Sequence, residues 1–334
     1  MKKKILLTGG CGFIGHNLAV YLNKKNYEVY ILDSLSVNNL LTFTDSEIKN
    51  KKLYRSILNE RIEIINNNKI NLSFSDAKNL HTYSELFKEI NPDIVIHLAA
   101  VSHANKSNKD PHNTFDNSLR TLESTLEVCR KNKTHIIYFS SSMVYGNFTT
   151  GVVNEKSKCD PIGIYGNLKL AGEMMVKSYN HVFDIPYTII RPSALYGERC
   201  VSRRVSQIFI ENLLTNNDIT INGDGSDKLD FTYIEDLIDG IEKCCSNNKA
   251  INQTFNLTYG KARKISELIE ILKGKFDNFK VIKKDREHLM PERGTLDISK
   301  ARDLIDYEPK FPIEVGYANY INWYKEFTRK LNVI

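Results

Sequence analysis

A tyrosine and a lysine in the middle of the chain have the types and spacing that acid–base chemistry requires. The segment YGNLK, from Tyr165 to Lys169, has the pattern Y-x-x-x-K within a stretch of helical pattern, 165–179. This spacing puts the phenol and the ammonium on one helix face. The cation, together with the charge of a nicotinamide, would stabilise the phenolate and lower the tyrosine pKa. Ser141, at the end of an earlier apolar strand, could hold a substrate oxygen while Tyr165 takes its proton. We expect Ser141, Tyr165 and Lys169 to be catalytic.

Glycines near the start of the chain are spaced to cradle a phosphate group. Gly9, Gly12 and Gly15 form G-x-x-G-x-x-G between an apolar strand and an amphipathic helix, 14–25. A tight turn and close approach to a pyrophosphate both need bare backbone, and the helix start offers free amides and a positive dipole end. The pattern predicts a dinucleotide site in which Phe13 and Ile14 take part.

Acidic and small residues at later strand ends complete this site. Asp33 ends the second strand, 18 residues past Gly15, where a carboxylate can accept both ribose hydroxyls and would repel the 2′-phosphate of NADP. The sequence therefore favours NAD. Asp76 and Ala77 follow the third strand, where the adenine edge should lie, although Asp76 alone fits a solvated turn equally well. Leu98, Ala99 and Ala100 form a small-residue turn after the fourth strand that lets the backbone pack against the cofactor.

The elements that must position these residues alternate between short apolar strands and helices. Strands are predicted at 4–7, 28–32, 70–74, 94–97, 136–140 and 187–191, with helices at 14–25 and 114–131 among others. This pattern predicts an α/β fold with a Rossmann-type doubly wound parallel sheet. Residues 1–191 are expected to form the NAD-binding domain, and 192–334 a smaller α/β substrate-binding portion, with re-entry into the first domain around 228–260. The Asn- and Lys-rich stretch 37–69 is expected to contain an added helix.

These motifs together resemble the extended short-chain dehydrogenase/reductases, the NAD-dependent epimerase/dehydratase group that acts on nucleotide sugars. The resemblance covers 4–323 and implies tightly held NAD and transient oxidation of a sugar hydroxyl by the Ser141, Tyr165 and Lys169 set. It implies cofactor contacts from Gly9, Gly12, Phe13, Ile14, Gly15, Asp33, Asp76, Ala77, Leu98, Ala99, Ala100, Asn117, Ser140, Tyr165, Lys169 and Pro192. It also implies that Arg293 pairs with the substrate diphosphate, which suits the planar fork of arginine.

The residues beside Ser141 separate the reactions within this group. Dehydratases of the family carry an Asp-Glu pair there, whereas this chain has Ser142 and Met143, which cannot exchange protons usefully near neutral pH. The chemistry that remains is hydride transfer, which predicts epimerisation at C4 through a transient 4-keto sugar. The alternatives are a net 4-dehydrogenase or ketoreductase, a 4,6-dehydratase, and a catalytically silent NAD-binding regulator.

The substrate contacts expected are His103, Ser141, Ser142, Met143, Arg199, Arg204, Lys228 and Arg293. Leu229 stands where relatives often carry a diphosphate-binding arginine, so Lys228 could substitute, although its side chain would start from the opposite strand face. The arginines at 199, 203 and 204 could bind a sugar carboxylate or the nucleotide phosphates. His103 could orient the substrate or contact only water.

Composition limits the partners and the cellular setting. The net charge of +6 comes largely from scattered lysines, so we expect no nucleic-acid partner, and no apolar run is long enough to span a membrane. The six cysteines lack zinc-ligand spacing, so no metal site is expected and a cytoplasmic location with free thiols is predicted. The resemblance further implies a homodimer formed through the helices 114–131 and 165–179.

Overall fold

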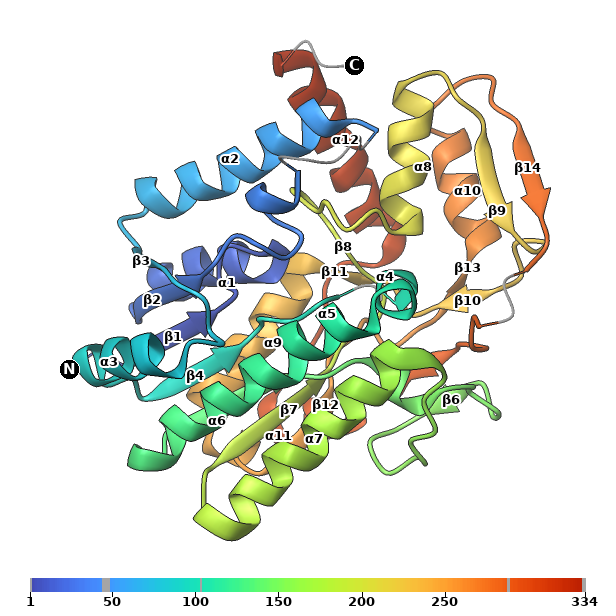
Figure 1. Cartoon of the computed structure of the whole chain (residues 1–334). Helices are drawn as coiled ribbons and strands as arrows, with labels where there is room; N and C mark the ends of the chain where they lie inside the picture. Colours follow the sequence, from blue (N-terminus) through green and yellow to red (C-terminus); the bar gives the residue numbers. More distant parts are fainter. Residues whose placement is uncertain (1, 44–48, 103, 287–288, 332–334) are drawn as a thin grey trace.

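A seven-stranded parallel sheet forms the centre of the computed structural model, which describes residues 2–43, 49–102, 104–286 and 289–331 (Figure 1). The strand order is β3-β2-β1-β4-β5-β7-β12, and every neighbouring pair runs parallel. The order reverses between β1 and β4, and ligands of such sheets bind beyond the strand ends at this point. The strands are β1 (Lys4–Thr8), β2 (Glu28–Asp33), β3 (Asn71–Phe74), β4 (Ile94–His97), β5 (His135–Phe139), β7 (Tyr187–Arg191) and β12 (Gln253–Asn256).

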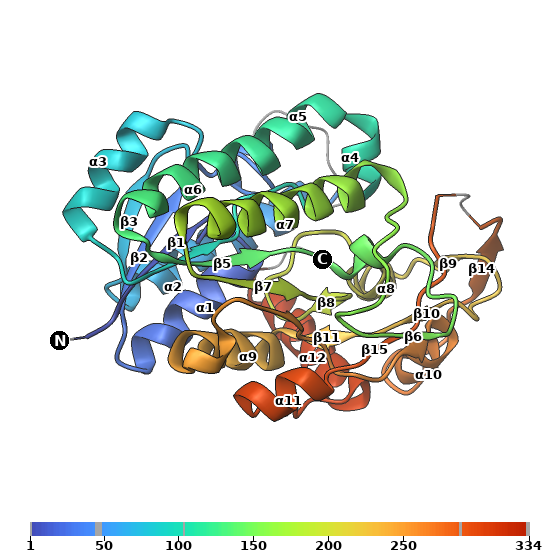
Figure 2. The same cartoon turned by 90° about the horizontal axis from the view of Figure 1, so that it is seen from below.

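Strands β1, β4, β5 and β7 are largely apolar and buried because both faces of the sheet are covered there. The parallel sheet confirms the predicted fold class. In β1, Ile5 and Leu7 belong to one buried cluster and Leu6 to another, as the alternation of side chains along a strand requires. Figure 2 shows a helical layer on each side of the sheet. One layer contains α3 (Leu80–Ile90), α6 (Thr121–Asn132) and α7 (Gly163–Phe183), and the other contains α1 (Phe13–Lys24), α9 (Ile234–Ser246) and α11 (Ser299–Ile305).

The single helix predicted over 114–131 is in fact divided. A short helix, α5 (Pro111–Phe115), runs into a π-helical segment, η2 (Asp116–Arg120), before α6 begins. The wider π turn lies next to the predicted cofactor site and contains Asn117. Such turns occur often at functional sites, and sequence periodicity does not reveal them.

The predicted helix in the 37–69 stretch is α2 (Lys51–Asn67), which buries an apolar face against the α1 layer. Two of its polar side chains connect to the C-terminal part of the chain. The Tyr54 hydroxyl donates to Glu211, and Arg61 donates to the backbone oxygen of Arg199. The insertion is therefore an integral part of the fold.

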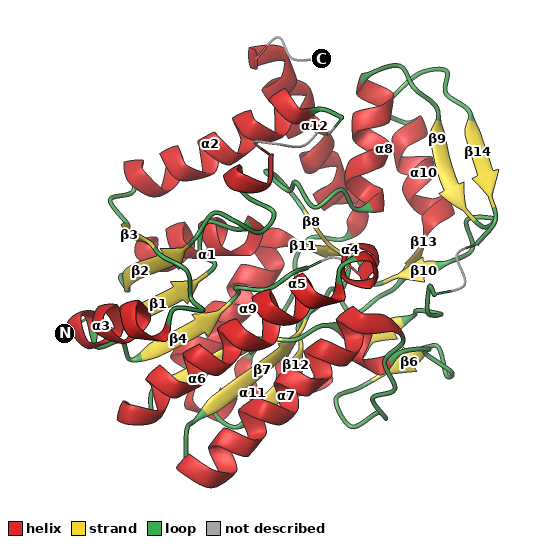
Figure 3. Cartoon of the chain, viewed as in Figure 1, coloured by secondary structure: helices red, strands yellow, loops and turns green. Residues whose placement is uncertain are grey.

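Beyond residue 191 the chain builds smaller elements and then returns to the central sheet at β12, within the 228–260 stretch (Figure 3). The exact division into two domains stays a prediction. The smaller paired strands are β6 (Val152–Val153) with β15 (Thr295–Leu296), β8 (Leu195–Tyr196) with β11 (Thr232–Tyr233), β9 (Ile219–Asn222) with β14 (Val281–Lys284), and β10 (Lys228–Leu229) with β13 (Arg263–Lys264). The remaining helices are α4 (Ala104–Lys109), α8 (Val205–Leu214), α10 (Ile265–Lys273), α12 (Ile313–Leu331) and the short 3-10 turns η1 (Leu40–Phe43), η3 (Ser142–Tyr145) and η4 (Asn248–Ala250).

Across the ranges that the structure describes, no helix is long and apolar enough to cross a membrane. All six cysteines are free thiols, and only Cys159 is not fully buried.

Candidate active site

The glycine loop after β1 touches the loop after β4, backbone against backbone. Gly9 has φ +73°, and a Cβ atom placed on it would lie 2.8 Å from the backbone nitrogen of Ala99. The amide of Gly12 donates to the oxygen of Gly9 over 3.1 Å, and α1 begins at the next residue without a side-chain cap. The first amides of α1 are therefore available to an anion such as a pyrophosphate.

A pocket lies over the carboxyl ends of β1, β2 and β4. It gathers most of the residues predicted to contact the cofactor, together with one predicted substrate residue, Arg204. Those that line it are Gly9, Gly12, Phe13, Ile14, Gly15, Asp33, Asp76, Ala77, Leu98, Ala99, Ala100, Asn117 and Arg204. The close backbone packing and the free helix start fit the diphosphate of NAD, although the individual contacts stay predictions.

The pocket also contains residues that the sequence did not point to. They are Leu32, Ser34, Ser36, Val37, Asn38, Arg61, Ser75, Ser102, Thr121, Leu195, Val201 and Ser202. Several lie next to or close to Asp33, Asp76 or Ala100 in the sequence and could have been found by adjacency. Arg61 and Val201 come from elements far away in the sequence, and no motif marked them.

Asp33 at the end of β2 is buried and held by two backbone amides. Its Oδ2 accepts from Cys11 over 2.9 Å and its Oδ1 from Leu35 over 2.7 Å. Burial raises the pKa of Asp33, while these bonds and the charge of Arg61 lower it. The carboxylate is thus fixed in the pocket wall where the sequence placed the ribose contact.

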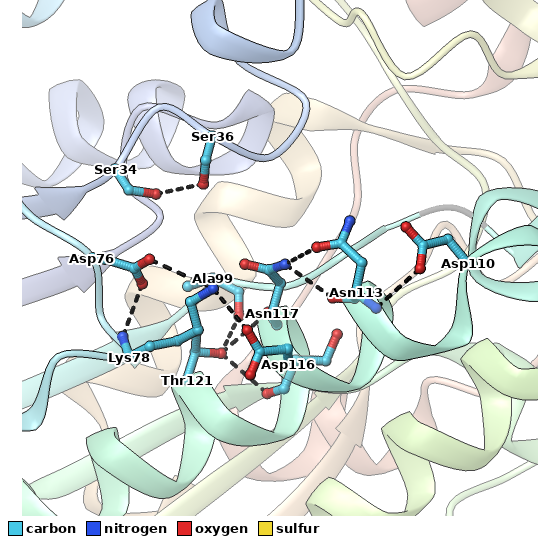
Figure 4. Close-up of polar contacts among 11 residues, drawn as sticks. Ser34, Ser36, Asp76, Lys78, Ala99, Asp110, Asn113, Asp116, Asn117 and Thr121 are labelled. Carbon is cyan, nitrogen blue, oxygen red and sulfur yellow. Dashed lines mark hydrogen bonds and ion pairs between the residues drawn. The ribbon is translucent and has the colours of Figure 1, made fainter.

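Figure 4 shows polar contacts on the opposite wall of the pocket. Lys78 forms ion pairs with Asp76 (3.6 Å) and Asp116 (2.9 Å), so Asp76 is not simply a solvated turn residue. The Thr121 hydroxyl donates to the oxygen of Ala99 over 3.1 Å, which ties the β4 loop to α6. Asn117 donates to the oxygen of Asn113 over 2.9 Å and lines the pocket from the π-helical segment.

The three predicted catalytic residues lie together beside this pocket. Ser141 begins the turn after β5, and its hydroxyl oxygen accepts from the amide of Met143 over 3.1 Å. Tyr165 and Lys169 both lie on α7, with the Lys169 ammonium 5.9 Å from the Tyr165 ring centre. The ammonium is buried and donates to the backbone oxygen of Phe139 over 2.7 Å, which holds it at the end of β5.

Charges around the tyrosine oppose the effect of its burial. Burial raises the pKa of Tyr165, and the charge of Arg204, a hydrogen bond with Ser141 and the charge of Arg293 lower it, in that order. The net direction in the protein alone is upward. The positive charge of an oxidised nicotinamide, when NAD is bound, would act in the opposite direction and favour the phenolate. Burial lowers the pKa of Lys169 to about 8.

Two arginines from the C-terminal part of the chain reach the catalytic tyrosine. Arg293 donates to the hydroxyls of Ser142 and of Ser193, the latter over 3.2 Å, and its Nε is buried without a partner. Arg204 precedes α8 and donates to the oxygen of Ser102 over 3.2 Å. Among the residues that the structure describes, neither arginine forms an ion pair. The buried Nε of Arg293 and the half-buried guanidinium of Arg204 leave positive charge here that is paired with no carboxylate of the described residues, so this side of the site favours an anionic ligand.

Three other predicted site residues either contact neighbouring side chains or are exposed to solvent. The Ser140 hydroxyl donates to the buried carboxylate of Glu173, and Arg199 pairs with Glu60 over 2.9 Å. Lys228 is exposed on β10, where the strand pairs with β13. The roles proposed for these three residues stay predictions.

Pro192 and His103 are the remaining predicted residues of the site. The Pro192 backbone oxygen accepts from the amide of Ser142 over 3.0 Å, which fixes the strand end beside Ser141. His103 lies outside the described residues. Within those residues, no group of three or more histidine, cysteine or acidic side chains could hold a metal ion.

A doubly wound parallel sheet, a glycine-rich turn at its switch point and a Ser-Tyr-Lys set define the class of dinucleotide-dependent short-chain dehydrogenases/reductases. The model of the NAD dependent epimerase/dehydratase family matches residues 5–258. The chain belongs to this family, and its cofactor is NAD, as the sequence predicted.

Individual relatives extend the match over the whole chain. A putative UDP-glucose 4-epimerase from Methanocaldococcus jannaschii is 32% identical and aligns over 97% of this chain and 99% of its own length. The crystal structure of a UDP-glucuronic acid 4-epimerase from Bacillus cereus, in complex with UDP-glucuronic acid and NAD, is 29% identical with a TM-score of 0.86, covering 97% of this chain and 99% of that one. A dTDP-D-glucose 4,6-dehydratase from Dictyostelium discoideum is 31% identical over 72% of this chain and 55% of its own length.

Proposed function

We propose that this protein epimerises a nucleoside-diphosphate sugar at C4 through a transient 4-keto intermediate. The observation that carries the proposal is the composition of the strand end beside Ser141. Ser142 and Met143 stand there, and both contact the guanidinium of Arg293. A hydroxyl and a thioether cannot supply the acid and base needed to eliminate water, so Tyr165 remains to transfer the proton.

Each catalytic side chain has a distinct role in this proposal. Tyr165 takes the proton of the C4 hydroxyl, Ser141 holds the same oxygen, and the Lys169 ammonium stabilises the phenolate. Bound NAD would supply a hydride acceptor, and in its reduced form a hydride donor, for C4 of the sugar, so that the reaction has no net redox change. Arg204 and Arg293 offer the positive charge that a sugar diphosphate requires.

Several names among the relatives support the substrate class. The Methanocaldococcus and Bacillus cereus proteins are both named as UDP-sugar 4-epimerases, whereas the Dictyostelium relative is named as a 4,6-dehydratase. A homodimer and a cytoplasmic location are also part of the proposal, the former supported by apolar side chains exposed along α7.

The test is to incubate the purified holoenzyme with UDP-, GDP-, dTDP- and CDP-sugars and follow the anomeric and H4 proton signals by NMR. Absorbance of reduced nicotinamide is read in parallel. The proposal predicts a C4 epimer without accumulated NADH, lost in Tyr165→Phe. Stoichiometric NADH with a 4-keto product would instead show a dehydrogenase, and a 4-keto-6-deoxy product a dehydratase.

A further inference from the structure

A third ionisable side chain lies on α7 behind the catalytic pair. Glu173 follows Lys169 by one helical turn and is only 1% exposed. A carboxylate buried this deeply needs a partner. Arg191 at the end of β7 provides one through two bonds, from Nε to Oε1 over 2.8 Å and from Nη2 to Oε2 over 2.6 Å.

This ion pair belongs to a buried network directly behind the catalytic strand end. The Ser140 hydroxyl, one residue before Ser141, donates to Glu173. On the other side Arg191 donates to the Tyr145 hydroxyl over 2.9 Å, which donates in turn to Asn256 over 2.7 Å. Glu173 is therefore held directly at the ends of β5 and β7, and through Arg191 and Tyr145 at β12, so its carboxylate has a fixed position relative to the sheet.

Few charges other than Glu173 act on the Lys169 ammonium. On α7 it faces Tyr165 and Glu173, and on β5 it lies 5.4 Å from the ring centre of Tyr138. His97 on β4 is neutral, because burial lowers its pKa to about 3, and the pKa of Tyr138 is raised by burial, so that ring is neutral too. Burial lowers the pKa of Lys169 to about 8, and the carboxylate of Glu173 opposes this effect.

We propose that Glu173 is a positioning residue that acts through Lys169, keeping its ammonium protonated so that the charge remains available to the Tyr165 phenolate. Arg191 limits this effect, because it neutralises part of the carboxylate charge while holding it in place. The inference rests on the proposed function, since it assumes that the reaction needs a charged Lys169.

The direct test titrates Lys169 in the NAD-bound protein. Selective ¹⁵N-lysine labelling gives an Nζ signal that Lys169→Met identifies. We expect Glu173→Gln to lower the Lys169 pKa by about one pH unit, because it removes a nearby opposite charge. Glu173→Asp keeps the charge and should largely restore the wild-type value. In activity assays the basic limb of the kcat profile should move down in pH by the same amount.

Glu211→Gln is the matched control, because Glu211 is also a buried glutamate held by hydrogen bonds, to Tyr54, Gln207 and Tyr324. It should cost stability without moving the Lys169 pKa. An unchanged Lys169 pKa in folded Glu173→Gln would overturn the inference and leave Glu173 a purely structural role. If the titration shifts but no nucleotide sugar is turned over by wild type, the proposed function fails while the link between the two residues stands.

Discussion

At the scale of single residues, the chemistry of the site depends on the balance between burial and charge at Tyr165 and Lys169. Their side chains were predictable from the sequence because a four-residue helical spacing fixes which face they share. Their electrostatic surroundings were not. The charges that lower the Tyr165 pKa belong to Arg204 and Arg293, which come from loops whose direction no local pattern reveals.

A pH dependence follows from the lowered pKa of Lys169. Because this pKa is about 8, the ammonium is charged below that pH and becomes neutral above it. We expect kcat to fall as pH rises through about 8, since the phenolate of Tyr165 then loses its stabilising charge. A stopped assay in buffers from about pH 6 to 10 measures this fall of kcat on the basic side of the pH profile. A kcat that stays level to pH 10 would contradict the role given to Lys169.

At the scale of elements, the glycine loop and its strands were predicted closely, whereas the insertion was predicted only as a helix. Strand ends and glycine spacing are local properties, so the phosphate-binding glycine loop (Gly9, Gly12 and Gly15) could be predicted from one segment of the sequence. The direction of the Arg61 side chain on α2 depends on packing against residues 138 positions away. The π-helical turn at Asn117 was missed for a similar reason, because it adds no distinct sequence period.

Two effects make Gly9 sensitive to substitution: its close contact with the backbone of Ala99 and its positive φ. A matched pair of variants separates their contributions to stability. Gly9 and Gly151 have nearly the same φ, +73° and +74°, but a Cβ on Gly151 would meet nothing within 4 Å. Gly151→Ala should therefore lower the unfolding free energy only by the cost of placing a side chain at positive φ, about 1–2 kcal/mol. Gly9→Ala should cost clearly more and reduce bound NAD. Equal losses in thermal unfolding and full NAD content would show that the contact with Ala99 is unimportant.

The α2 insertion should contribute to cofactor retention through Arg61. This guanidinium is fully buried, lines the cofactor pocket and lowers the pKa of Asp33. We expect Arg61→Met to weaken NAD binding about tenfold or more, because a hydrogen bond to a charged group contributes about 1.5–3 kcal/mol. The NAD content after purification and calorimetric titration measure this. Arg55→Met, an exposed position on the same helix, should leave both unchanged.

At the scale of the whole molecule, the site is assembled where two parts of the chain meet. The cofactor pocket comes mainly from the first half, while Arg204 and Arg293 reach Tyr165 from beyond residue 191. The sequence predicted both halves and the return of the chain to the central sheet at β12. It could not predict which arginine faces the catalytic tyrosine. Arg199, which the sequence also assigned to the substrate, pairs with Glu60, and its substrate role stays a prediction.

The proposed homodimer predicts a specific effect of charge on α7. Met174 and Val182 are 64% and 65% exposed, an unusual exposure for large apolar side chains that association would reduce. The double substitution Met174→Glu and Val182→Glu should produce monomers in sedimentation experiments. Ile282→Glu on β14, an exposed apolar position away from α7, should leave the oligomeric state unchanged. A wild type that sediments as a monomer would refute the proposal.

The central claim is that hydride leaves C4 and returns to C4 without exchange with solvent. Its most direct measurement is to convert a suitable nucleotide sugar in D₂O and to locate deuterium in the product by NMR. Hydride transfer predicts a C4 epimer with no deuterium bound to carbon, because no proton is removed from a carbon atom at any step. Deuterium at C3 or C5 would show proton removal from carbon, and the account of Tyr165 acting only on the C4 hydroxyl would then be wrong.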